Sequence, residues 1–403
     1  MNNPIVHSVL LAASMTLATA TTAAQQPTPE QMWEIIQSQQ KEIEALKRSQ
    51  QDTAKQAADA DEKAEAAVVA VEETSTGSRG NWADRTTIGG YGELHYNNIE
   101  GADDEIDLHR FVLFFGHKFT DNIRFFSEFE IEHDVAGEGQ PGEVEVEQAY
   151  VEFDIRDGLQ AKGGVFLLPI GILNETHEPD TFYGVERNDV ENIIIPATWW
   201  AGGAALTGQH ANGVSWDLAI HEGLKIDSTG GSNPFRVRSG RQKTGEAIAN
   251  DFAVTGRLRY TGIPGLELAA SLQYQTDASQ TSGDGLDKGV LYETHAVYQK
   301  GPFGLRALYA EWDFDGTAVT TAGADEQKGW YIEPSFKVHD KLGLYTRYED
   351  IEGGRSQDMF DQWEVGLNFW PHKQVVIKAD YRDRELDNNT DFSAFDLGIG
   401  YQF

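Results

Sequence analysis

The most constraining feature of this 403-residue chain is a series of short segments in which apolar and polar positions alternate. Alternation with a period of two indicates a β-strand with one face toward an apolar medium and the other toward a polar one. Sixteen such segments are found: 87–96, 107–119, 123–132, 146–155, 159–167, 199–208, 214–221, 251–261, 266–275, 289–299, 303–312, 328–338, 342–350, 362–370, 375–384 and 392–403. An even number of antiparallel strands predicts a closed barrel with both ends on one side.

The connections between these segments alternate in length. Short ones, such as 120–122, 156–158 and 300–302, are built from turn residues, whereas 168–198 and 222–250 are long. Outer-membrane barrels combine short periplasmic turns with long outer loops. The pattern therefore predicts an all-β, sixteen-stranded antiparallel transmembrane barrel over residues 86–403.

The last segment shows the two faces clearly. Phe395, Leu397 and Ile399 lie on one face, and Asp396 lies on the other with small residues. The apolar face is expected to face lipid, because hydrocarbon offers no partners for charges. Pro334 interrupts the segment 328–338, where its missing N–H would leave a gap in the ladder unless a bulge absorbs it.

The chain before the barrel has three predicted parts. Residues 1–24 have an apolar stretch followed by small residues, which predicts a signal peptide cleaved after Ala24, although no Lys or Arg precedes the stretch. Residues 25–75 carry a heptad pattern that includes Met32, Ile36 and Ile43, and this predicts a helical coiled-coil stem. An isolated, solvated amphipathic helix is the alternative. Residues 76–85 form a linker.

Composition excludes several classes of function. The chain has no Cys, which rules out disulfides, thiol catalysis and Cys-based zinc sites. A formal net charge of −33 argues against nucleic acid as a partner. Two interpretations of this acidity stay open: solvation of the surface, or a preference for cations in whatever the protein conducts.

Motifs for catalysis or metal binding are absent from the sequence. It contains no His-Glu-x-x-His, no Gly-x-Ser-x-Gly and no Walker-type loop, so we expect no enzyme, no cofactor and no metal site. His133 beside Asp134, and His177 beside Glu178, are expected to lie in solvated loops, and contact with a cation at the outer mouth is the alternative. A TonB-dependent transporter is excluded, because it needs a plug domain and about 22 strands. A barrel with a structural or adhesive role stays a rival.

Several segments resemble the phosphate-selective porin O and P family: the N-terminal stem, TIGGYGELHYN at 87–97, QAYVEF at 148–153 and the terminal Phe403. The resemblance implies an outer-membrane porin of a Gram-negative bacterium, with a water-filled channel for passive diffusion of small hydrophilic solutes and ions. It also implies a homotrimer in outer-membrane lipid with a periplasmic stem. Phe403 would be presented to the barrel-assembly machinery, and phosphate would be guided by lumenal basic residues.

The connection 168–198 is the predicted pore constriction. It occupies the place of the constriction loop of general porins, between strands five and six, and its length suits a functional loop. Its isoleucines would pack inside the barrel while its charged residues face the opposite wall: Glu175, Glu178, Asp180, Glu186, Arg187 and Asp189. A surface loop that meets a neighbouring subunit is the alternative.

Strand parity predicts a set of basic residues that line the pore: Arg124, Arg257, Arg259, Arg347, Lys378 and Arg382. These residues could guide phosphate, or they could form a lattice of salt bridges with lumenal carboxylates such as Glu267, Glu349 and Asp380. Inward-facing carboxylates outnumber the bases. We therefore expect a weakly selective channel, with a phosphate- or anion-selective porin as the alternative.

Overall fold

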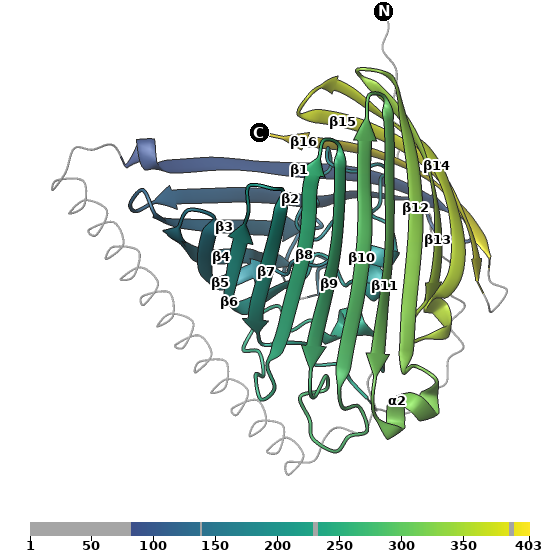
Figure 1. Cartoon of the computed structure of the whole chain (residues 1–403). Helices are drawn as coiled ribbons and strands as arrows, with labels where there is room; N and C mark the ends of the chain where they lie inside the picture. The colour runs from purple at the N-terminus through teal and green to yellow at the C-terminus, as the bar shows by residue number, and fades with distance from the viewer. Residues whose placement is uncertain (1–81, 138, 229–232, 387–390) are drawn as a thin grey trace, which may run out of the picture. The chain divides into compact units, whose positions relative to one another are not determined.

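A computed structural model describes residues 82–137, 139–228, 233–386 and 391–403. These residues form sixteen antiparallel strands in one closed barrel, in which each strand pairs with its neighbours in the sequence and β1 pairs with β16 (Figure 1). The strands are β1 Thr86–Ile99, β2 Glu105–Lys118, β3 Ile123–Glu132, β4 Val144–Arg156, β5 Leu159–Leu167, β6 Trp200–Gln209, β7 Val214–His221, β8 Ala253–Ile263, β9 Leu266–Gln275, β10 Gly289–Lys300, β11 Phe303–Phe314, β12 Glu326–His339, β13 Leu342–Glu352, β14 Met359–His372, β15 Val375–Leu386 and β16 Phe392–Gln402. The predicted sixteen-stranded antiparallel barrel is confirmed.

Every predicted strand lies within three residues of an observed one at both ends. The largest differences are extensions, as in β1 and β14, because ladder pairing continues past the positions where apolar residues alternate. At Pro334 the ladder between β12 and β13 lacks a pair, since proline has no N–H to donate. The register on either side of Pro334 is the same, so no bulge absorbs this gap.

Helical elements in the described part of the chain are short: η1 Ala83–Arg85, η2 Val190–Ile194, η3 Val237–Gly240, α2 Thr317–Ala322 and η4 Ser356–Asp358. None of the described helices is long and apolar enough to cross a membrane. The predicted signal peptide, the stem and residues 76–81 of the linker lie outside the described residues, and those predictions stay untested.

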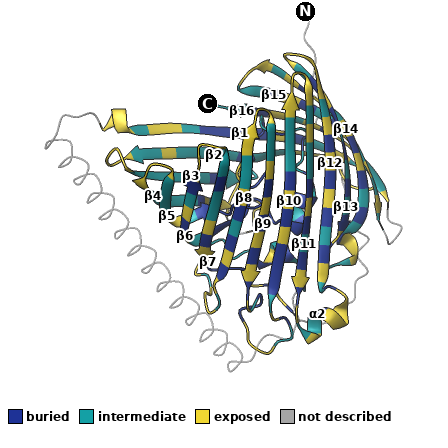
Figure 2. Cartoon of the chain, in the orientation of Figure 1, coloured by how far each residue is buried: buried dark blue, intermediate teal, exposed yellow. Residues whose placement is uncertain are grey.

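The two faces of the barrel wall differ as the alternation predicts. On β14, the side chains of Trp363 and Val365 are 58% and 57% exposed, whereas the side chain of Glu364 between them is 3% exposed. Exposed and buried bands alternate along most strands in the same way (Figure 2). The wall therefore presents apolar side chains outward and polar side chains inward, the arrangement expected of a barrel in lipid.

A large apolar cluster lies inside the barrel. It includes Trp312 of β11, Ile194 of the connection 168–199 and Leu224 and Ile226 of the connection 222–252. We call the whole group of buried apolar residues to which these four belong the apolar cluster. Because two long connections supply much of it, the cluster joins them to the inner wall.

Candidate functional site

The connection 168–199 between β5 and β6 is closed at its base by one asparagine. The amide of Asn174 donates to the carbonyls of Leu168 (2.7 Å) and Trp199 (3.0 Å), and its carbonyl accepts the Trp199 N–H (2.6 Å). The connection therefore leaves and re-enters the wall as one closed loop, which we call the inner loop.

Glu191 stabilises the turn of the inner loop from within. Its carboxylate accepts the backbone N–H groups of Ile172 (2.7 Å) and Leu173 (2.6 Å) and the hydroxyl of Tyr331 on β12 (2.9 Å). The side chain of Glu191 is fully buried, and its hydrogen bonds supply the partners that a buried carboxylate needs. Glu191 is not among the predicted constriction residues.

The apolar side of the inner loop packs on β11–β13. Ile193, Ile194 and Ile195 are buried in the apolar cluster, and the indole N–H of Trp312 donates to the carbonyl of Ile194 (2.9 Å). The element η2 contacts β11, β12 and β13. Burial of large side chains against the inner wall holds this part of the loop inside the barrel.

The polar side of the inner loop contacts the remaining wall at many points. Glu175 pairs with Arg257, Glu186 with His95 (3.0 Å), and Asp189 with Arg384. The Val185 N–H donates to Asp380 (2.7 Å), and Lys378 donates to the carbonyl of Gly184 (2.7 Å).

The other three predicted loop residues differ in their surroundings. Glu178 is half-buried, and its carbonyl accepts from Thr181. Asp180 is also half-buried, and burial raises the pKa of its carboxyl. Arg187 donates to the hydroxyl of Thr198 (2.8 Å), and burial lowers the pKa of its guanidinium.

The six predicted basic residues of the wall all have close partners, mostly carboxylates. Arg347 contacts Glu333 (3.0 Å), Glu349 (2.6 Å) and Glu364 (2.5 Å). The other predicted residues pair as follows: Arg124 with Glu152 and Asp154, Arg257 with Glu175 and Asp217, Arg259 with Glu267, and Arg382 with Asp396, whereas Lys378 lies 3.6 Å from the centre of the Phe182 ring. Arg257, Arg347 and Lys378 also contact the inner loop. The partners of Arg124 and Arg259 given above lie on the wall.

Arg187, which was predicted, forms a second basic group with Arg238 and Arg241, which were not predicted because they lie on a loop rather than a strand. We call these three residues the loop arginine group. The guanidinium of Arg238 donates to the carbonyl of Ala197 (2.5 Å), and that of Arg241 donates to the carbonyl of Thr198. Within the described residues, Arg187, Arg238 and Arg241 form no ion pair with a carboxylate. Burial, and then the neighbouring Arg241, holds the pKa of Arg238 well below its usual range.

Carboxylates face this loop arginine group. A small cavity is lined by Arg187, Arg238, Arg241 and Lys243 on the loop side and by Glu132, Glu145 and Glu147 from β3 and β4. A second cavity of about 380 Å³ adjoins it, since both are lined by Arg110, Arg187 and Arg238, and it also includes His109, Glu186 and Arg382 in its lining. The interior on this side thus has charges of both signs in close opposition.

A β-bulge explains why strand parity did not predict that His109 lines the larger cavity. Glu93 pairs with Arg110 and His95 with Asp107, so β2 contains one residue more than β1 over this interval. Neighbours in a regular strand point to opposite faces, yet His109 and Arg110 both line the larger cavity. Bulges re-aim side chains in this way, and no strict alternation can reveal them.

His177, which was expected to lie in a solvated loop, is the clearest departure from the sequence prediction. It is buried, with its Nε2 at 3.4 Å from Glu128 and 3.5 Å from Glu147. Burial disfavours the imidazolium, but the two carboxylates outweigh burial and raise the pKa of His177 to about 10. His177 is therefore charged at neutral pH and ties the inner loop to β3 and β4.

Comparison with solved structures shows the fold to be that of the outer-membrane porins. OmpF of Salmonella typhi has a TM-score of 0.57 at 15% identity, and both this chain (79%) and that one (97%) are well covered. The outer membrane channel DcaP of Acinetobacter baumannii has a TM-score of 0.55 at 12% identity, with coverage of 79% and 97%. The anion-selective porin of Comamonas acidovorans has a TM-score of 0.54 at 13% identity, with coverage of 79% and 99%.

At the level of sequence, the chain is 30% identical over 358 residues to an uncharacterized protein of Aquifex aeolicus (strain VF5), which covers 79% of this chain and 80% of that protein. The chain belongs to the same family as this protein. No model of a known protein family matches it, so membership of the phosphate-selective porin O and P family stays a prediction.

Proposed function

We propose that this protein is an outer-membrane channel for the passive diffusion of small hydrophilic solutes and ions. The observation that carries the proposal is the closed sixteen-stranded barrel with apolar side chains outside and charged side chains inside. A buried charge is costly unless the interior offers water or partners, and a lumen provides both. The porin fold supports the same function and a location in the outer membrane of a Gram-negative bacterium.

Single-channel recording tests this proposal directly. The purified protein, added to a planar lipid bilayer, is expected to produce stepwise increases of conductance that scale with the concentration of KCl. Insertion without such steps would contradict a channel and favour a structural or adhesive barrel.

We propose that the inner loop constricts this channel. Its contacts with inward-facing residues of β1 and of β11–β15 support the proposal. Glu175, Glu186 and Asp189 would face the lumen as partners of wall cations, and they would offset the charge of those cations. This offset supports weak selectivity, because a paired arginine projects less field than a free one.

A second candidate function is an anion-selective channel. The loop arginine group supports it, since Arg187, Arg238 and Arg241 are half-buried, line one cavity and form no ion pair with a carboxylate within the described residues. An inorganic phosphate or a carboxylate solute would supply the missing negative charge, and guanidinium groups suit both. This site differs from the predicted one at Arg257 and Arg259, whose guanidinium groups lie near Glu175, Asp217 and Glu267.

We further propose a homotrimer in outer-membrane lipid, with Phe403 presented to the barrel-assembly machinery and the N-terminal stem in the periplasm. The barrel size and the heptad pattern of residues 25–75 support the trimer. Native mass spectrometry of the full-length protein is expected to find three chains, and a stable monomer would contradict this assembly.

A further inference from the structure

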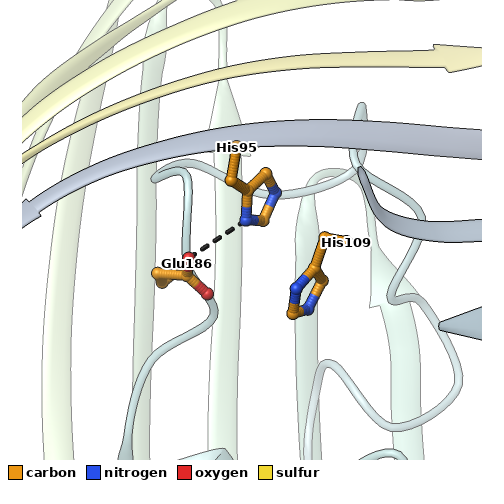
Figure 3. Close-up of side chains that lie close together, drawn as sticks. All are labelled: His95, His109 and Glu186. Carbon is orange, nitrogen blue, oxygen red and sulfur yellow. Dashed lines mark hydrogen bonds and ion pairs between the residues drawn. The ribbon is translucent and has the colours of Figure 1, made fainter. Parts of the chain in front are cut away.

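Two histidines and a glutamate lie together beside the larger cavity (Figure 3). His95 of β1 and Glu186 of the inner loop are 3.0 Å apart, from Nδ1 to Oε1, and the rings of His95 and His109 of β2 stack with their centres 4.6 Å apart. One nitrogen or oxygen from each of the three residues lies within 4.8 Å of the others. Two imidazoles and a carboxylate are a ligand set that divalent transition metals bind.

A further carboxylate orients each histidine. Glu93 lies 3.3 Å from Nε2 of His95 and is itself held by Arg110 at 2.7 Å. Asp107 lies 3.3 Å from Nδ1 of His109. Metal-binding histidines commonly use one ring nitrogen for the ion and the other for such a carboxylate. This arrangement leaves Nδ1 of His95 and Nε2 of His109 for an ion.

The fold brings these ligands together from three separate segments. The bulge in β2 allows His109 to face the interior beside Arg110, and Glu186 comes from the far part of the inner loop. The positive side chains near the group are themselves paired: Arg110 with Glu93 and Glu130, and Arg382 with Asp396. The charge of Arg110 and Arg382 is therefore partly compensated before an ion arrives, although Arg187 and Arg238 also line the cavity.

We propose that His95, His109 and Glu186 form a binding site for a divalent first-row transition metal ion such as Zn²⁺. Water would complete the coordination from the side of the cavity, because three protein ligands leave positions open. The ion needs a neutral imidazole and an ionised carboxylate, so its binding competes with protons at His95 and Glu186. A bound ion would also link the inner loop to β1 and β2.

The site can be tested by metal binding alone, so the result does not depend on channel function. The full-length protein, purified in detergent without a histidine tag, is titrated with Zn²⁺ in a calorimeter. We expect one ion per chain. His95→Ala and His109→Ala should each weaken binding by more than about tenfold, a loss at least as large as that from removing an outer-shell partner. His210→Ala is the matched control, because His210 is exposed in the turn between β6 and β7 at the opposite end of the strands.

Further measurements test the metal site even if one of these variants folds poorly. Glu186→Gln keeps the size of the side chain and should weaken Zn²⁺ binding while circular dichroism stays that of the barrel. Co²⁺ should give visible absorption that Zn²⁺ removes. Absence of binding to the unmodified protein, or equal affinity in His95→Ala, would overturn the site. So would a loss in His133→Ala alone, which would move the ion to the neighbouring group of Asp107, His109 and His133.

Discussion

Two regions of the barrel interior contact the inner loop in opposite ways. Around Trp312 and Ile194 the inner loop meets the wall through the apolar cluster, with few charges. Around Arg110 and Glu147 the interior is lined by charged side chains of both signs, and cavities remain between them. We call this second region the charged wall.

The inner loop joins the two regions, and the difference between them shows what each part of it does. Its isoleucines anchor it by burial, which is strong and does not depend on direction. Its charged residues make directional contacts with the opposite wall and leave room for water. The apolar cluster therefore holds the loop against the wall, and if the proposed constriction is correct the charged wall would determine which solutes pass it.

Removing most of the inner loop, which contacts both regions, should have the largest effect, and this effect is on conductance. Replacing residues 174–191 with a short Gly/Ser linker is expected to raise single-channel conductance several-fold, because both the proposed constriction and its charges are lost. Replacing the exposed residues 101–104 in the same way is the control and should leave conductance unchanged. Unchanged conductance in the first variant would separate the inner loop from the conduction path.

A single substitution in the apolar cluster should have the next largest effect, which is on the free energy of unfolding. Trp312→Ala removes a fully buried indole and the hydrogen bond to Ile194, so we expect the free energy of unfolding in urea to fall by about 3–5 kcal/mol. Trp82→Ala is the matched control, because this side chain precedes β1 and is 69% exposed, and it should cost much less. Equal losses in the two variants would show that the cluster does not anchor the loop.

Loss of unpaired charge at the charged wall should have a moderate effect on selectivity. The double variant Arg238→Gln with Arg241→Gln is expected to shift the zero-current potential in a KCl gradient toward cations. Two unit charges about 4 Å apart in water interact by about 1 kcal/mol, so a change of up to about fivefold in permeability ratio per charge is expected.

The predicted basic pair of β8 provides the comparison for that measurement. Arg257→Ala with Arg259→Ala should shift the potential less, because carboxylates near these side chains already offset their charge. If phosphate blocks the unmodified channel, the block should be lost in the Arg238 and Arg241 variant. A block that depends instead on Arg257 and Arg259 would restore the site predicted from the sequence.

The smallest effect in the physiological pH range is expected at His177. Its folded pKa of about 10 lies above the ordinary value of 6.5, so the stabilisation is fully present below pH 6.5 and is lost as the pH rises through 10. The difference in unfolding free energy between the unmodified protein and His177→Gln should follow this course, whereas His210→Gln should show no such dependence. A difference that disappears near pH 6.5 would mean that Glu128 and Glu147 do not hold the charge.

The barrel could be predicted from the sequence because each strand carries its own evidence. In Phe392–Gln402 and Met359–His372, lipid on one side of the wall and the interior on the other set the polarity of alternate residues. The local alternation of polarity is therefore enough to predict each strand. The inward position of Arg347 and Glu364 followed from the same parity. The proposed metal site of His95, His109 and Glu186 could not be predicted, because the bulge reverses the alternation of faces within β2.

The sequence by itself determined the sixteen strands, their two faces and the alternation of short and long connections, since all three depend on residues close together in the chain. Only the tertiary structure decided which charges meet. Arg257 and Glu175 are 82 positions apart, and Asp189 and Arg384 are 195 apart. No local pattern encodes such pairs, because closing the barrel and packing the inner loop against it bring them within reach.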